Sequence, residues 1–346
     1  PQDRYEVVYE RIGNFDEGII TRVLAGDKAD VVYISRPRVA QWVVNGFAQP
    51  LDKYIARDNF PIDDYLPFAL DEVQYEGQTF GIPIATDVRG LYYNKRIFTE
   101  LGLDPSTTPR SWAELEEYAK QLTTLNADGS FGRVGFVPHL GAGNQAYIWL
   151  YGNDAEVIDA DRRRIVLNSP EAVEALRWVV DLVSWYGVEA LGSLPDNPWL
   201  RDRAVMWVEG SWYWTTLGGG GRNIDDYAVA PIPAKDPSSP GTSLSAGWTF
   251  VMFPGDSPEG AWEFMKFISK PENTYSFVAE RNLLPVTFSY RQYEPYREHL
   301  ATVPHFAPLL EIATFSRPYP ANPDFGYMQT RMTQMLTSAI NRETTP

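Results

Sequence analysis

The chain of 346 residues contains no cysteine and no long apolar run. Without cysteine it forms no disulfide, thiolate nucleophile or iron–sulfur cluster, and most structural zinc sites are excluded. A membrane-spanning helix needs about 18 or more apolar residues in succession, and the sequence has no such run. Basic residues are in the minority, with 30 Lys and Arg against 45 Asp and Glu. The net charge of −15 argues against a nucleic-acid partner, which requires a basic patch.

Catalytic and metal-binding motifs are scarce as well. The three histidines, His139, His299 and His305, do not have the spacing of metal ligands. No G-x-S-x-G segment occurs, and the glycine run at 218–221 lacks the Lys-Ser or Lys-Thr that follows it in a P-loop. Adjacent carboxylates, such as those at 63–64, are expected by chance among 45 acidic residues. We therefore expect no metal, no cofactor and no enzymatic activity.

Strand and helix patterns alternate along the whole chain, which favours the α/β class. Residues 5–9 alternate like a strand, 16–24 have helical spacing, and 30–34 form a short apolar run typical of a buried parallel strand. Further strands are predicted at 90–93, 204–208, 227–232 and 249–253. The length suits two domains, and no linker composition separates them. We expect the chain to cross between two domains through short segments.

Three helix starts are marked by serine. Ser111 and Glu114 have the spacing of a capping box and predict a helix over 112–124. Ser169 and Ser257 each precede a proline, the residue favoured in the first turn of a helix.

Aromatic residues are abundant, at 14% of the chain with 11 Trp and 20 Tyr. Four of them, Trp207, Trp212, Tyr213 and Trp214, follow one another closely at the end of the strand predicted at 204–208. Core packing explains any single one of these rings. Indole faces also stack on the C–H faces of sugars, whose hydroxyls pair with Asp, Asn and Arg side chains. The cluster therefore predicts a sugar-binding cleft.

Six segments resemble, in order, motifs of the extracellular solute-binding proteins of ABC importers, in the sugar-binding group that includes maltose-binding protein. One of them reads LYYNKRIF, like the family's lyYNkdlF. The resemblance implies two α/β lobes of the periplasmic-binding-protein fold, each a central sheet flanked by helices, with three hinge crossings. The six segments are 25–32, 77–83, 91–98, 109–115, 204–212 and 261–268.

The resemblance also implies the division of the chain. The N-terminal lobe would comprise 1–86 and 250–286, and the C-terminal lobe 89–245 and 288–346. The hinges would lie near 86–89, 244–249 and 285–289. Family members begin with a strand and a helix before the segment that matches 5–9, so we expect this lobe to lack them and to expose a sheet edge. No export leader is visible before this segment, and an exported protein would have lost it.

The resemblance further implies a ligand site between the lobes. Trp212 matches the stacking tryptophan of the family, and Asp87 matches a carboxylate that accepts from sugar hydroxyls. Trp248 stands where the family has a second glycine, after Gly247, and so adds a ring beside the ligand. The other positions that match ligand-contacting stretches are Ser35, Arg36, Arg38, Asn144, Gln145, Tyr147 and Tyr327.

The function implied is the capture of a carbohydrate by hinge closure and its delivery to the membrane permease of an ABC importer. We expect a monomer outside the cytoplasm, in the periplasm or anchored at the cell surface as a lipoprotein. Two alternatives stay open. A glycoside-acting enzyme also uses stacking aromatics and carboxylates. A binder of the same fold would take a glycerophosphodiester or a sugar acid if Arg36 and Arg38 paired with an anion.

Overall fold

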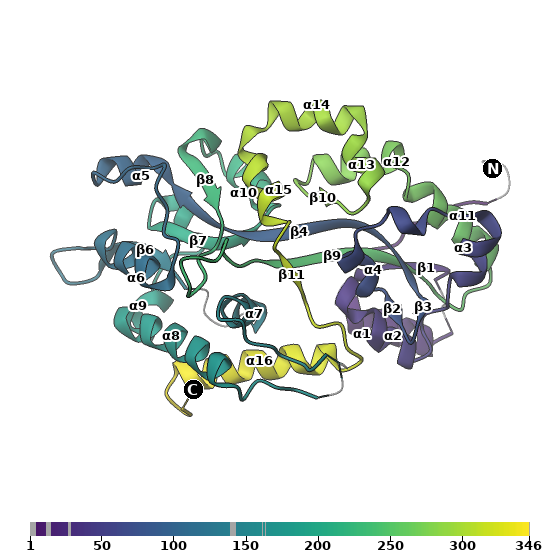
Figure 1. The fold of residues 1–346 in the computed structure, drawn as a ribbon, viewed down its shortest axis with the longest axis horizontal. Helices are drawn as coiled ribbons and strands as arrows, with labels where there is room; N and C mark the ends of the chain where they lie inside the picture. The colour runs from purple at the N-terminus through teal and green to yellow at the C-terminus, as the bar shows by residue number, and fades with distance from the viewer. Residues whose placement is uncertain are drawn as a thin grey trace.

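Two long strands, β4 (Gly81–Asn94) and β9 (Leu244–Met252), run through the middle of the molecule and connect its two halves (Figure 1). The computed structural model describes residues 5–11, 15–26, 29–138, 143–160, 162 and 164–345. All 14 residues of β4 are buried. At about 3.3 Å per residue a strand of this length spans roughly 45 Å. It is therefore long enough to belong to both halves.

The sheet is continuous through β4 and β9. In the described part of the chain it has nine strands, and its main order is β1-β9-β4-β7-β6-β5; β8 and β10 also pair with β4, and β11 pairs with β9. The seven further strands are β1 (Val31–Ser35), β5 (Thr124–Leu125), β6 (Phe131–Val137), β7 (Ala204–Gly210), β8 (Tyr227–Ala230), β10 (Leu284–Pro285) and β11 (Arg317–Pro318). The α/β class is confirmed, with the sheets of the two halves joined rather than separate.

The half on the right of Figure 1 is built around β1. A small hairpin of β2 (Gln74–Tyr75) and β3 (Gln78–Thr79) lies beside it. In its core Trp262 stacks on Tyr54, with 5.6 Å between ring centroids. The helices of this half are α1 (Phe15–Leu24), α2 (Val39–Val44), α3 (Asp52–Asp58), α4 (Pro67–Asp71), α11 (Pro258–Ile268) and α12 (Pro271–Ala279).

Two predictions at the start of the chain were wrong. Residues 5–9 are irregular instead of a strand, and Val7, Val8 and Tyr9 are 65%, 75% and 84% exposed. β1 is antiparallel to β9 instead of parallel to a neighbour. Alternation of apolar residues makes a strand only where another strand offers backbone partners. Among the described residues, no strand pairs with 5–9, and β1 pairs with β9 alone.

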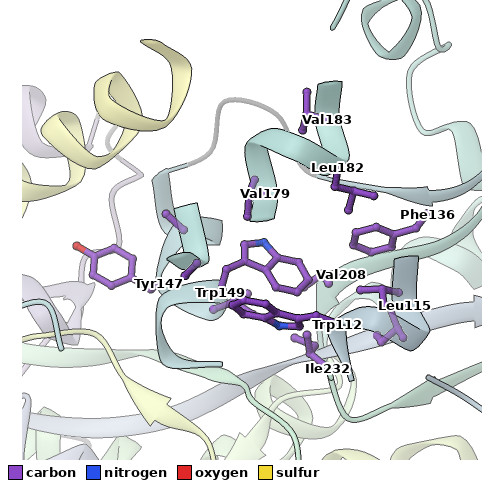
Figure 2. Close-up of a cluster of buried hydrophobic side chains, with 14 of the residues drawn as sticks. Trp112, Leu115, Phe136, Tyr147, Trp149, Val179, Leu182, Val183, Val208 and Ile232 are labelled. Carbon is purple, nitrogen blue, oxygen red and sulfur yellow. The ribbon is translucent and has the colours of Figure 1, made fainter. Parts of the chain in front are cut away.

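The half on the left of Figure 1 has the larger core. Figure 2 shows Trp112 and Trp149 at the centre of this core, with Val179 above them and Ile232 below. Trp178 stacks on Trp112, with 4.8 Å between centroids. The helices of this half are α5 (Lys95–Glu100), α6 (Trp112–Gln121), α7 (Gly143–Tyr151), α8 (Pro170–Tyr186), α9 (Val188–Gly192), α10 (Tyr213–Gly219) and α16 (Phe325–Ile340). Between the halves, along the top, lie α13 (Phe288–Gln292), α14 (Glu294–Thr302) and α15 (Ala307–Ile312).

The predicted helix starts are confirmed, although one works differently. The Ser111 hydroxyl accepts from the backbone N–H of Glu114 at 3.2 Å, and the Ser169 hydroxyl accepts from that of Ala172 at 3.1 Å. These bonds satisfy amides of the first turn that have no partner within the helix. The Ser257 side chain makes no such bond; its backbone N–H donates to Asp30 Oδ1 at 2.7 Å instead.

A fully buried ion pair lies where β4 passes the short 3₁₀ helix η1 (Arg36–Arg38). Arg36 Nε donates to Glu72 Oε2 at 2.7 Å, and its Nη1 and Nη2 donate to Ala85 O and Thr86 Oγ1 at 2.8 and 3.2 Å. Burial raises the pKa of Glu72, and the adjacent guanidinium opposes that rise. A Cβ at position 247 would overlap Arg36 Nη1, so this position accepts only glycine. Arg36 thus links three segments: η1, the end of α4 at Glu72, and β4.

We expect Arg36→Met to lower the free energy of unfolding by about 3 kcal/mol or more, because it leaves the Glu72 carboxylate buried without its cation. Urea denaturation at neutral pH measures the change. Arg57→Met is the matched control. Arg57 is likewise ion-paired, with Asp58 and Glu259, but its side chain is 44% exposed, so the free energy of unfolding should change little. An equal decrease in the free energy of unfolding in the two variants would contradict this role of Arg36.

Candidate ligand-binding site

The candidate site lies on one face of the sheet, where β4 leaves β9 and joins β7. Residues opposite each other in an antiparallel pair point to the same face. Ala85 pairs with Trp248, Asp87 with Ala246, and Arg89 with Gly210. Because side chains alternate along a strand, Ala85, Asp87 and Arg89 also share that face. The pairing therefore brings Asp87, Arg89 and Trp248 to one surface, with small residues between them.

Asp87 and Arg89 form an ion pair between Oδ1 and Nη1, with side chains only 6% and 9% exposed. Arg89 also donates a side-chain hydrogen bond to Tyr319, and burial lowers the pKa of its guanidinium while Tyr319 and Glu209 act in the opposite direction. The Ser243 hydroxyl accepts from the Arg89 N–H at 3.1 Å and donates to its carbonyl at 2.7 Å. The backbone is thus fixed where β4 changes partners.

Trp212 lies beside this ion pair. The Arg89 guanidinium carbon sits over the indole at 4.3 Å from the ring centroid. A Cβ on Gly210 would overlap the six-membered ring of Trp212, so the indole packs directly against the backbone of β7 at this glycine. Trp212 stays partly exposed, whereas Trp207, Tyr213 and Trp214 are 1%, 4% and 3% exposed and belong to the core. Of the aromatic cluster, Trp212 alone is placed to meet a ligand.

Trp248 provides a second ring on the same face. Its side chain is 38% exposed and stacks on Tyr33 of β1, with centroids 5.2 Å apart and planes 16° apart. Burial raises the pKa of Tyr33 well above its ordinary value, so this phenol stays neutral. The stacked rings of Tyr33 and Trp248 therefore form an aromatic surface on the same face of the sheet as the Asp87–Arg89 pair.

This arrangement suits the binding of a polyhydroxylated molecule. Indole faces offer apolar stacking surfaces, and a carboxylate and a guanidinium offer acceptors and donors to hydroxyls. The described residues contain no group of three His, Asp or Glu side chains placed to hold a metal ion. His139 lies outside the described residues.

The sequence and the fold both match known binding proteins. Residues 4–275 match the family model described as bacterial extracellular solute-binding protein. The chain belongs to this family. A solute-binding relative is the maltotriose-binding protein of Pyrococcus abyssi, 22% identical over 289 residues, which cover 81% of this chain and 60% of that protein. A binding protein of Brucella abortus is 26% identical over 308 residues, 86% of this chain and 72% of that protein.

Solved structures of solute-binding proteins share the fold. One with mannobiose bound has a TM-score of 0.84 at 22% identity and covers 95% of this chain and 83% of its own. The matching proteins are binding proteins rather than enzymes. In the part of the chain that the structure describes, no helix is both long and apolar enough to cross a membrane.

The predicted ligand residues fall into different places in this solute-binding protein. Trp212, Asp87 and Trp248 lie at the site described above, and Ser35 of β1 pairs with Trp248. Gly247 pairs with Thr86 and faces Arg36 on the opposite side of the sheet. Arg36 has no exposed surface, so in this structure it offers nothing to a ligand. Its predicted role followed from its position in the chain, whereas its donors bind Glu72, Ala85 O and Thr86 Oγ1. Arg38 lies over the ring of Phe325 at the start of α16, at 5.9 Å.

The remaining predicted residues lie on α7 and α16. Gln145 and Tyr147 of α7 are 7% and 0% exposed, and Tyr147 packs edge-on against Tyr319 at 5.3 Å. Tyr327 is 58% exposed, and its hydroxyl accepts from Arg331 at 2.9 Å on the surface of α16. The side chain of Asn144 lies outside the described residues.

Three residues of the site were not predicted: Arg89, Gly210 and Tyr319. Arg89 follows Asp87 by two positions, so strand alternation was a signal for it. Tyr319 follows β11, which runs parallel to β9, and this pairing carries it to the ion pair. Gly210 lies two positions before Trp212, but only the structure shows that the indole packs against this end of β7.

We expect Gly210→Ala to push the Trp212 indole off the strand and shift the tryptophan emission to longer wavelength, because the ring gains contact with water. Fluorescence spectra of the unliganded protein measure this. The difference should vanish in a Trp212→Phe background, and Gly219→Ala, where a Cβ meets nothing within 4 Å, should leave the spectrum unchanged. A spectral shift that persists without Trp212 would refute this placement.

Proposed function

We propose that this protein captures an uncharged carbohydrate between its two halves and delivers it to the membrane permease of an ABC importer. The observation that carries the proposal is the common face of Trp212, Asp87 and Trp248, set by the pairing of β4 with β7 and β9. Two indoles flanking a carboxylate match the mixed apolar and polar surface of a sugar ring. The ligands named for its relatives, maltotriose and mannobiose, support the same class.

The charges near the site favour a neutral ligand over an anion. Arg36 is paired with buried Glu72, and Arg89 is paired with Asp87. An anion would have to compete with a carboxylate for either guanidinium, at the cost of leaving that carboxylate unpaired. Asp87 is already paired with Arg89, whereas a glycoside hydrolase uses two separate carboxylates as acid and base.

We propose the lobe division expected from the family, with crossings near 86–89, 244–249 and 285–289. Contacts between the halves in this structure support closure around a ligand. Arg162, in the loop after α7, pairs with Asp71 of α4. Arg38 of η1 lies over Phe325 of α16. Isolated contacts of this kind are individually weak, so a bound ligand that touches both halves can decide between open and closed states.

We propose that the protein acts as a monomer outside the cytoplasm. The extracellular description of its family supports this location. The same location is where a permease would receive the closed, loaded form. A periplasmic protein and a lipid-anchored surface protein both satisfy this requirement.

We expect Trp212→Ala to weaken carbohydrate binding by about 30-fold or more, since a central aromatic contact contributes about 2 kcal/mol. A thermal-shift screen of mono- to trisaccharides, including maltotriose and mannobiose, identifies the ligand through the rise in melting temperature. Calorimetric titration then gives the affinities. Trp185→Ala is the control, because Trp185 is exposed on α8 and contacts Lys120 instead. Unchanged affinity in Trp212→Ala would remove the stacking role.

We expect the carbohydrate that passes this screen to decrease the radius of gyration, because ligand contacts with both halves stabilise the closed state. Small-angle X-ray scattering with and without the ligand measures the change. Trp212→Ala at the same ligand concentration is the control and should show no decrease. An identical radius with and without bound ligand would exclude hinge closure, even if binding itself is confirmed.

A further inference from the structure

Arg89 lies at the centre of the site, and its backbone is held by bonds that do not involve its side chain. Its backbone is already bonded by Ser243, and β4 pairs with β7 beside it. Its side chain makes three contacts of another kind: the ion pair with Asp87, the hydrogen bond to Tyr319 and the contact over the Trp212 ring. All three partners belong to the site.

The Asp87–Arg89 pair leaves part of each group available. Arg89 donates to Oδ1 of Asp87, and among the described residues no group donates to Oδ2. A guanidinium has five N–H donors in a plane, of which the two partners take only some. A hydroxyl that approaches the pair can therefore donate to the carboxylate and accept from the guanidinium at once.

The pair also determines the net charge of the site. Both side chains are at least nine-tenths buried, so water screens them poorly. One positive and one negative charge cancel, and an uncharged ligand preserves this balance. An ammonium group would meet Arg89, and an added carboxylate would meet Asp87; either would place an unbalanced charge in a poorly hydrated site.

We propose that Arg89 sets the charge selectivity of the site: by neutralising Asp87 against the Trp212 face, it makes the site accept uncharged sugars and reject amino sugars and sugar acids. This inference rests on the carbohydrate-binding function proposed above. Without Arg89, Asp87 would remain as a single buried carboxylate, and an ammonium group on the ligand would take the place of the guanidinium.

The test compares three classes of ligand on the wild-type protein and two Arg89 variants by calorimetric titration near pH 6. The neutral probes are maltotriose and mannobiose; the cationic probe is a glucosamine trisaccharide with an amine on every ring, and the anionic probe is a galacturonic acid trisaccharide. We expect the wild-type protein to bind a neutral probe at least about tenfold more tightly than either charged probe.

Arg89→Met keeps the length and apolar stem of the side chain and removes its charge. We expect the ratio of cationic to neutral affinity to rise at least about tenfold, and the ratio of anionic to neutral affinity to fall. Arg89→Lys keeps the charge but not the planar contact with the indole, so the wild-type order should remain while the neutral probe binds several-fold more weakly. Arg57→Met, on the surface, should change neither ratio.

Asp87→Asn provides the mirror experiment and does not depend on the folding of the Arg89 variants. It leaves Arg89 without its carboxylate partner, so the affinity for the anionic probe should rise relative to the affinity for the neutral probes. Equal loss of affinity for every probe in both Arg89→Met and Asp87→Asn would show a structural role only and overturn the inference. A wild-type protein that binds the neutral probes without discriminating against charged ones overturns it too. Failure to bind any neutral probe would instead refute the carbohydrate function, and the inference with it.

Discussion

The antiparallel pairing of β4 with β9 is the interaction on which the other features depend. It runs from Gly81 to Val88 on one strand and from Ser245 to Val251 on the other, and beyond it β4 continues into the second half beside β7. The connection between the two halves of the sheet and the position of the candidate site both follow from this single register. A shift of one residue would turn Asp87 and Arg89 to the opposite face and separate them from Trp212.

The buried pair of Arg36 and Glu72 secures this register from one side. Arg36 binds Ala85 O and Thr86 Oγ1 just before the crossing, and it fills the space that a side chain at 247 would need. The site itself thus follows a rigid, satisfied segment of β4. Two ion pairs thus contact neighbouring positions of this strand: Arg36, paired with Glu72, binds its backbone at Ala85, and Asp87 and Arg89 pair with each other on the face of the candidate site.

Local features of this chain could be predicted from sequence, whereas features that depend on distant partners could not. The caps at Ser111 and Ser169 depend on residues three positions away, so spacing alone revealed them. The placement of Trp212 beside three buried aromatics depends on Arg89 of β4, and the burial of Arg36 depends on Glu72 and Ala85, which are 36 and 49 positions away. The strand predicted at 5–9 failed for the same reason, because alternation says nothing about whether a partner strand is present.

The continuity of the sheet has a mechanical consequence. β4 and β9 cross between the halves as a hydrogen-bonded ribbon, so any rotation of one half against the other must bend and twist that ribbon rather than turn about loose chain. A paired ribbon of this kind resists bending elastically, and the resistance grows with the angle. The backbone pairing around Asp87 and Ala246 would therefore oppose a large rotation of one half against the other.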